Sequence, residues 1–168
     1  MATHNIIPTD VEDCEQWNAK SFALPAGVEY MAGHSVDYDW KAIGSPEVRR
    51  ICTLALARHM WPKADSHTLG ACIYNIYPHA QAREMLKNSH GVAADVENTL
   101  RLLQTICLAL NVREWHSVWQ LSEKARVPTH MNFGKYKGLP VQAVPADYVR
   151  WLRNQPDTDP YLMKAFAR

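Results

Sequence analysis

The chain has 168 residues, of which 47% are hydrophobic, and its formal net charge is +1. This composition is typical of a folded intracellular protein and predicts one modest core with a small appendage. No run reaches the length of a membrane span, the amino end has no secretory leader pattern, and the four cysteines form no Cys-x-x-Cys pair. We therefore expect a cytoplasmic protein with reduced thiols and no membrane contact.

The charges are unevenly distributed along the chain. Residues 1–48 hold eight acidic and two basic side chains, whereas residues 126–168 hold seven basic and three acidic ones. An acidic region joined to a basic one suits a nuclease, whose metals need carboxylates and whose phosphate-tracking surface is positive. Basic patches also occur on ordinary protein surfaces, so the pattern favours this function without requiring it.

The first predicted elements place one carboxylate at the end of a strand. Residues 1–18 show no regular pattern, and residues 28–33 form a short, largely apolar run that breaks at Gly33. A helix is predicted over 37–43, with Asp39 in its first turn. Asp39 is therefore expected at the carboxyl end of a strand, where open α/β sheets bind ligands.

The middle of the chain is predicted to be helical and to carry a second carboxylate. A short strand near 50–53 is followed by helices near 54–61, 67–76, 79–88, 92–111 and 113–126. His90 lies on the polar loop before the longest of these helices, and Asp95 lies one turn inside it. Helical spacing predicts that this helix buries one stripe, which comprises Val92, Val96, Leu100, Leu103, Cys107 and Leu110.

Two carboxylates and a histidine suit the metal-assisted attack of water on a phosphodiester. In that chemistry, carboxylates hold two divalent cations about 3.5–4 Å apart, and an imidazole removes the proton from water. Asp39, Asp95 and His90 are the candidates for these roles. The same residues also fit a simpler interpretation, because acids are common in the first turns of helices and loop histidines are commonly exposed.

The last part of the chain has the pattern of a small separate module. Residues 127–130 are the predicted linker, and residues 133–138 form a predicted tight turn between short extended segments. Two helices, each opened by a proline, are predicted near 145–154 and 159–167.

Within the predicted turn, Lys135 and Lys137 flank Tyr136. Lysines beside an aromatic residue and glycines can grip phosphates and stack a base. The same residues can also form a turn with solvated lysines, and the sequence favours neither interpretation.

The order of the motifs resembles that of the DEDDh (DnaQ-like) 3′-to-5′ exonucleases. That family carries a His-Asn-x-x-Phe-Asp element, a Cys-Thr-x-x-x-Ala-Arg-x-x-x-Pro connection, a His-x-Leu helix start and a final His-x-x-x-x-Asp element. The counterparts in this chain are residues 34–39, 52–62, 67–69 and 90–95. Ser35 replaces the usual Asn and Tyr38 the usual Phe. The resemblance implies that Asp39 and Asp95 are metal ligands and that His90 is the general base.

The tail resembles the small C-terminal module of the exodeoxyribonuclease X group and its phage relatives. Residues 133–138 match their Phe-Gly-Lys-Tyr-x-Gly run, and residues 148–152 match their Tyr-Leu-x-Trp-Leu run. The resemblance spans roughly residues 28–168. It implies a helix-rich α/β protein, with a ribonuclease H-like exonuclease domain over 1–126 and a small α+β module over 131–168.

The family's first element, Asp-x-Glu-Thr-x-Gly, has no convincing counterpart here. Asp10 and Glu12 have the Asp-x-Glu spacing, but Pro8 interrupts the preceding apolar pair and no Thr-x-Gly follows. We therefore expect a truncated fold that lacks the first strands and two of the four carboxylates. Because an open sheet edge at Val28–Ala32 is a template for pairing, we also expect self-association or a partner polypeptide that completes the sheet.

The resemblance implies magnesium- or manganese-dependent removal of nucleotides, with single-stranded DNA or DNA 3′ ends as the partner. Two other functions stay open. One is a non-catalytic regulator of phage origin that keeps the exonuclease shape to bind a nucleic-acid end or a partner protein. The other is one half of a split enzyme. Only the resemblance of the tail favours DNA over RNA.

Overall fold

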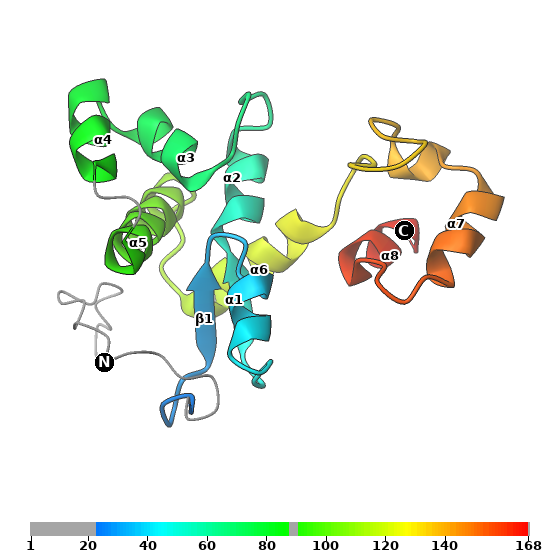
Figure 1. Cartoon of the computed structure of the whole chain (residues 1–168), viewed down its shortest axis with the longest axis horizontal. Coiled ribbons are helices and arrows are strands. Elements are labelled where there is room, and N and C mark those ends of the chain that lie inside the picture. Colours follow the sequence, from blue (N-terminus) through cyan, green and yellow to red (C-terminus); the bar gives the residue numbers. More distant parts are fainter. Residues whose placement is uncertain (1–22, 88–90, 168) are drawn as a thin grey trace. The chain divides into compact units, whose positions relative to one another are not determined.

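The structure, a computed structural model, describes residues 23–87 and 91–167 (Figure 1). Three predictions fall outside the described residues. They concern the irregular stretch over 1–18, the Asp-x-Glu spacing of Asp10 and Glu12, and the general base His90. Contacts divide the chain into two compact units, residues 1–122 and residues 123–168.

The sheet of the first unit consists of two parallel strands within the described residues. β1 spans Tyr30–Gly33 and β2 spans Arg49–Cys52, and α1, which spans Asp37–Ala42, lies between them in the sequence. The predicted strand, helix and second strand are thus confirmed. Two strands alone are marginally stable in water, so the helices packed around them must supply most of the stability.

The remaining helices of the first unit follow the predicted ranges within a few residues. They are α2 (Thr53–Met60), α3 (Leu69–Ile76), α4 (His79–Leu86), α5 (Val92–Ala109) and α6 (Trp115–Arg126). α5 packs against α2, α3 and α4. The largest fully buried apolar side chains are Ile51, Leu56, Ile73, Leu102, Leu103 and Ile106. The protein is therefore helix-rich with a small sheet, which is compatible with the predicted α/β class.

The buried face of α5 differs from the predicted stripe. Leu103 and Cys107 are buried as expected, but Val92 is 78% exposed and Val96 51% exposed. The buried face of α5 instead includes Leu102 and Ile106. Helical spacing identifies sets of residues that share a face, but the position of the neighbouring helices decides which set is covered.

One long-range hydrogen bond ties α6 to the end of β2. The hydroxyl of Ser122 accepts a 2.8 Å hydrogen bond from the backbone N–H of Cys52, and both residues are buried. A buried backbone donor without a partner would be destabilising by about 1–3 kcal/mol. The side chain of Ser122 therefore completes the hydrogen bonding of the strand end that leads into α2.

The described cysteines are reduced and buried, as predicted. Cys52, Cys72 and Cys107 are free thiols, and Cys14 lies outside the described residues. Burial raises the pKa of the Cys72 and Cys107 thiols above the usual value, which keeps them protonated and unreactive.

The second unit is built from the last turn of α6, a short 3₁₀ turn and two helices. η1 spans Val141–Ala143, α7 spans Ala146–Arg153 and α8 spans Pro160–Phe166. Its core comprises Met131, Val141, Val144, Leu152, Leu162 and Ala165. The hydroxyl of Tyr161 donates a 2.5 Å hydrogen bond to Glu123. The last turn of α6 therefore belongs to this unit.

The extended segments predicted around residues 133–138 are shorter than an α+β module requires. Within the described residues of this unit, His130 and Pro140 form one isolated antiparallel bridge and no longer strand pair exists. Met131 donates to the carbonyl of Leu139, and Gly138 donates to that of Met131. On the other side of the bridge Val141 donates to the carbonyl of Thr129, and η1 begins at Val141, so the segment is a closed turn beside helices.

In residues 23–87 and 91–167, no helix combines the length and the apolar character that crossing a bilayer would require.

Candidate functional site

Asp39 occupies the position that the sequence predicts, at the carboxyl end of β1. A Cβ atom placed on the buried Gly33 would stand 3.3 Å from Oδ2 of Asp39 and 3.2 Å from Cα of Val36. Because such contacts are tighter than ordinary packing, a glycine at the end of the strand lets the carboxylate lie over it. The side chain of Asp39 is exposed and so can reach a ligand.

The neighbouring acid of α1 is already engaged. The carboxylate of Asp37 pairs with the guanidinium of Arg50, which lies 4.0 Å from the ring centroid of Trp40. Asp39, by contrast, forms no ion pair with any residue that the structure describes. Asp39 is therefore the first-turn carboxylate of α1 that remains available to a cation.

His34 holds the end of β1 in place through both of its ring nitrogens. Its Nδ1 lies 3.1 Å from Oγ1 of Thr53, and its Nε2 lies 2.9 Å from the backbone carbonyl of His67. The ring of His67 in turn lies 2.8 Å from the carbonyl of Trp61. These contacts join the end of β1 to the start of α2 and to the segment before α3.

The surroundings of His34 favour its neutral form. Burial lowers the pKa of His34 below its ordinary value, and the positive charge of Arg58 acts in the same direction, whereas the hydrogen bond to His67 opposes them. A carbonyl oxygen can only accept, so Nε2 carries the proton and donates to His67. In the neutral ring Nδ1 can only accept, so the single hydroxyl proton of Thr53 serves either Nδ1, at 3.1 Å, or the carbonyl of Gly33, at 3.3 Å.

Asp95 also lies where the sequence predicts, in the first turn of α5, and its side chain is exposed. However, no three His, Cys, Asp or Glu side chains in the described ranges are grouped closely enough to hold a metal ion. His90 lies outside those ranges. Two carboxylates supply fewer ligands than a two-metal hydrolytic centre needs, so the described donor set does not fit the implied magnesium or manganese pair.

The predicted nucleic-acid residues Lys135, Tyr136 and Lys137 lie on the turn that follows Met131. Both lysines are exposed, and the ammonium of Lys135 lies 5.3 Å from the ring centroid of Tyr136. Tyr136 itself is half-buried against the core of the second unit. The three residues are therefore close together, and the lysines remain open to a ligand.

Sequence reasoning missed the aromatic neighbours of Tyr136. The ring of Tyr136 meets that of Tyr148 edge-on, with centroids 4.8 Å apart, and Tyr148 stacks on Trp151 at 5.2 Å. Tyr148 and Trp151 are three residues apart on a predicted helix whose apolar stripe already includes Leu152. A tryptophan just outside such a stripe is the signal that could have identified this cluster.

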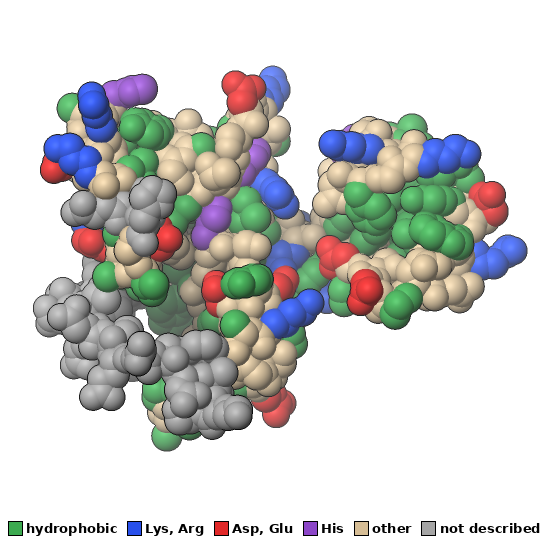
Figure 2. All heavy atoms as spheres, in the orientation of Figure 1, with side chains coloured by type: hydrophobic (Ala, Val, Ile, Leu, Met, Phe, Trp, Pro, Cys, Tyr) green, Lys and Arg blue, Asp and Glu red, His purple; other side chains and the backbone are tan. Residues whose placement is uncertain are grey.

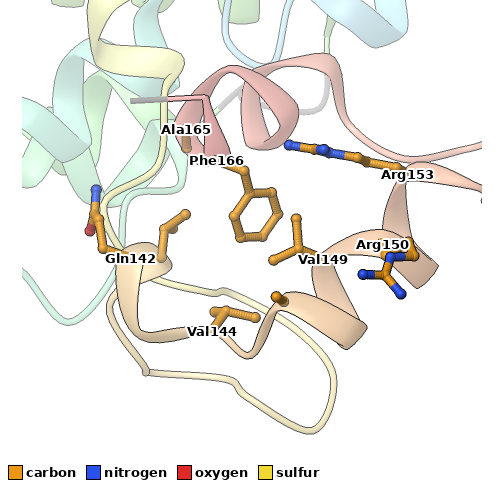
Figure 3. Close-up of a pocket in the computed structure, with 9 residues that line it drawn as sticks. Gln142, Val144, Val149, Arg150, Arg153, Ala165 and Phe166 are labelled. Carbon is orange, nitrogen blue, oxygen red and sulfur yellow. The ribbon is translucent and has the colours of Figure 1, made fainter.

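The second unit also contains a pocket of about 450 Å³ between η1, α7 and α8 (Figure 3). Val144, Val149 and Phe166 form its apolar side, and Arg150 and Arg153 extend from α7 at its edge. Figure 2 shows the same arrangement on the surface, with hydrophobic side chains gathered between α7 and α8 and both basic and acidic ones around the rim of the unit. The pocket thus combines an apolar side with two basic side chains at its edge.

The chain is similar to known proteins in two ways. Residues 121–158 match the protein family described as a putative quorum-sensing-regulated virulence factor. Over 163 residues, the chain is 26% identical to Exodeoxyribonuclease 10 of Escherichia coli K12 and to the protein of the same name from Escherichia coli O6:H1. Each alignment covers 94% of this chain and 71% of the relative. No solved structure matches the chain. The chain is thus distantly similar, along nearly its whole length, to an exodeoxyribonuclease.

Proposed function

We propose that this chain is an exonuclease-type protein that acts on or binds DNA 3′ ends. In this proposal the first unit has a ribonuclease H-like exonuclease fold, of which the described residues provide two strands, and the second unit binds the nucleic-acid strand. The observation that carries the proposal is the position of Asp39, an exposed carboxylate without an ion pair to any described residue, at the carboxyl end of β1. The distant similarity to an exodeoxyribonuclease supports the choice of DNA.

Asp39 and Asp95 would be the cation-binding carboxylates and His90 the group that takes a proton from water. Magnesium or manganese would supply the charge that stabilises the attacking and leaving oxygens. Because the described residues provide only two such carboxylates, we expect slow hydrolysis by this chain alone. A complete site would need ligands from elsewhere, such as Asp10 and Glu12 or a partner polypeptide.

Lys135, Tyr136 and Lys137 would contact the strand through phosphates and one base. Each phosphate neutralised by a lysine releases counterions, so affinity should fall steeply as salt rises. The excess of basic side chains over residues 126–168 supports this role.

The test is a digestion of labelled single-stranded DNA with a free 3′ end, with magnesium or manganese present. We expect degradation at least about 1,000-fold slower than by a complete exonuclease, and complete loss of this residual activity in Asp39→Ala and Asp95→Ala. Asp157→Ala is the matched control, because Asp157 is an exposed acid of the second unit, and it should leave the activity unchanged.

Two outcomes would contradict these expectations. Digestion as fast as that of a complete enzyme would contradict the slow hydrolysis and would mean that additional carboxylates complete the site. A chain that neither digests DNA nor prefers a strand with a free 3′ end to a circular strand would contradict the proposal and favour the non-catalytic regulator. The observation that supports the non-catalytic regulator is the absence of a metal-binding cluster from the described residues.

A further inference from the structure

The aromatic residues of the second unit form a continuous row that ends at the surface. Tyr136 meets Tyr148 edge-on at 4.8 Å, and Tyr148 stacks on Trp151 at 5.2 Å with an angle of 29° between the rings. Tyr136 and Tyr148 are half-buried and pack on the core, so they support the row from beneath. Trp151 is 51% exposed, and the stack with Tyr148 restricts the orientation of its ring.

An exposed tryptophan of this kind differs from an ordinary core aromatic. Folding normally buries a large part of an indole, because the ring is the largest apolar side chain. Here one side of the ring stacks on Tyr148 and half of the residue's surface remains in water. A rigid, half-exposed ring at the end of an aromatic row can stack a further flat group.

The charges around this row favour an anionic partner. Residues 131–153 contain the basic side chains Lys135, Lys137, Arg150 and Arg153 and only one acid, Asp147. None of the four cations forms an ion pair with a residue in the described ranges. Lys164, in the same unit, instead pairs with Glu123. These four basic residues of the second unit therefore remain available to phosphates.

The helix α7 carries both kinds of side chain, on different sides. Tyr148 and Trp151 stack on each other, and Arg150 and Arg153 extend from α7 at the edge of the pocket (Figure 3). Lys135 adds a cation 5.3 Å from the ring centroid of Tyr136 at the other end of the row. Aromatic rings between cations are the arrangement by which proteins bind single strands without reading their sequence.

We infer that Trp151, supported by Tyr148 and Tyr136, is a base-stacking platform for single-stranded nucleic acid. Lys135 and Lys137, on the turn that carries Tyr136, contact phosphates of the same strand. This inference deepens the proposed function and rests on it for the choice of nucleic acid as the ligand. Because every base has an aromatic face, the platform is tolerant of sequence and accepts DNA and RNA strands.

The test measures binding of the full chain to labelled oligo(dT) and oligo(U) by fluorescence anisotropy, without divalent metal. Trp151→Ala should weaken binding roughly 5- to 150-fold, the range for the loss of one stacked base, and Trp151→Phe should weaken it less. Leu108→Ala is the matched control, because Leu108 is an apolar residue of the first unit that is 82% exposed. It should leave the affinity unchanged.

The salt dependence separates stacking from charge. Trp151→Ala should keep the slope of affinity against salt, because no phosphate contact is lost. Lys135→Ala combined with Lys137→Ala should flatten the slope by roughly 0.7 for each lost contact to a single strand. The far-ultraviolet circular dichroism and the denaturation midpoint of each variant identify any loss that comes from misfolding.

Two results would overturn the inference. One is the absence of oligo(dT) and oligo(U) binding at low salt. The other is an unchanged affinity in correctly folded Trp151→Ala and Trp151→Phe. Either result would favour a protein partner for Trp151. A chain that binds strands through Trp151, but neither prefers 3′ ends nor hydrolyses DNA, would contradict the proposed function and leave this inference intact.

Discussion

A Cβ atom at Gly134 would stand 2.6 Å from the hydroxyl oxygen of Tyr148, closer than real Cβ contacts allow. Gly134 also has a φ of +68°, which side chains of L-residues rarely adopt. Gly134 therefore allows the turn that carries Lys135 to lie close to α7, because glycine has no side chain and adopts this φ without strain.

Gly134→Ala should therefore be more destabilising than Gly138→Ala. Gly138 has a φ of +86° but nothing within 4 Å of an added Cβ, so its substitution should cost only the backbone strain, about 1–2 kcal/mol. Gly134→Ala adds the steric conflict with Tyr148. Urea denaturation of the full chain, followed by circular dichroism, measures both free energies of unfolding.

Combining Gly134→Ala with Tyr148→Phe tests the cause. Removal of the hydroxyl removes the atom that the added Cβ would meet, so the double variant should recover most of the difference between the two glycine sites. Equal destabilisation by Gly134→Ala and Gly138→Ala would show that the approach of Tyr148 has no energetic role.

The stability of the first unit should fall as the pH is lowered through the range in which histidine titrates. The pKa of His34 is lowered in the folded protein, chiefly by burial, whereas the unfolded chain has the ordinary value of about 6.5. Below that value the unfolded state binds a proton more readily than the folded state does. The contribution of neutral His34 is therefore complete above about pH 6.5 and is lost as the pH falls toward the lowered folded value.

Denaturation midpoints measured between about pH 8 and pH 5 check this sign. Substituting His34→Gln should flatten the decline, in addition to weakening the contacts with Thr53 and His67. His79→Gln is a matched control, because His79 is exposed at the start of α4. A wild-type midpoint that stays constant or rises on acidification would contradict the assignment of His34 as a neutral donor.

The open side of β1 should drive self-association or pairing with a partner polypeptide. Among the described residues β1 pairs only with β2, and Val28 and Ala32 are exposed. Exposed strand edges are templates for another chain. Multi-angle light scattering should therefore give a mass above that of the monomer, and Ala32→Lys should lower it.

The choice of residue matters for this experiment. The ring of Tyr30 stacks on Trp115 at 6.1 Å and lies 5.3 Å from the guanidinium of Arg49, so a charge at Tyr30 would disturb the fold itself. Ala109→Lys, at an exposed alanine of α5, is the matched control. A cooperatively folded monomer whose mass neither substitution changes would rule out this edge as an interface.

Local patterns were sufficient to predict the positions of the elements and of two candidate ligands. Asp39 and Asp95 lie in the first turns of α1 and α5 as predicted, because helix starts and strand ends depend on residues that are close in sequence. The glycine at position 33 likewise marks the end of β1.

Only the tertiary structure decided which surfaces are covered and which side chains meet. It exposes Val92 and Val96, seats His34 between Thr53 and the carbonyl of His67, and leaves Trp151 half in water on top of Tyr148. Each of these outcomes depends on residues brought together from distant positions or on the shape of a neighbouring helix. Sequence spacing determines which residues share a face of one helix, whereas burial and contact depend on what packs against that face.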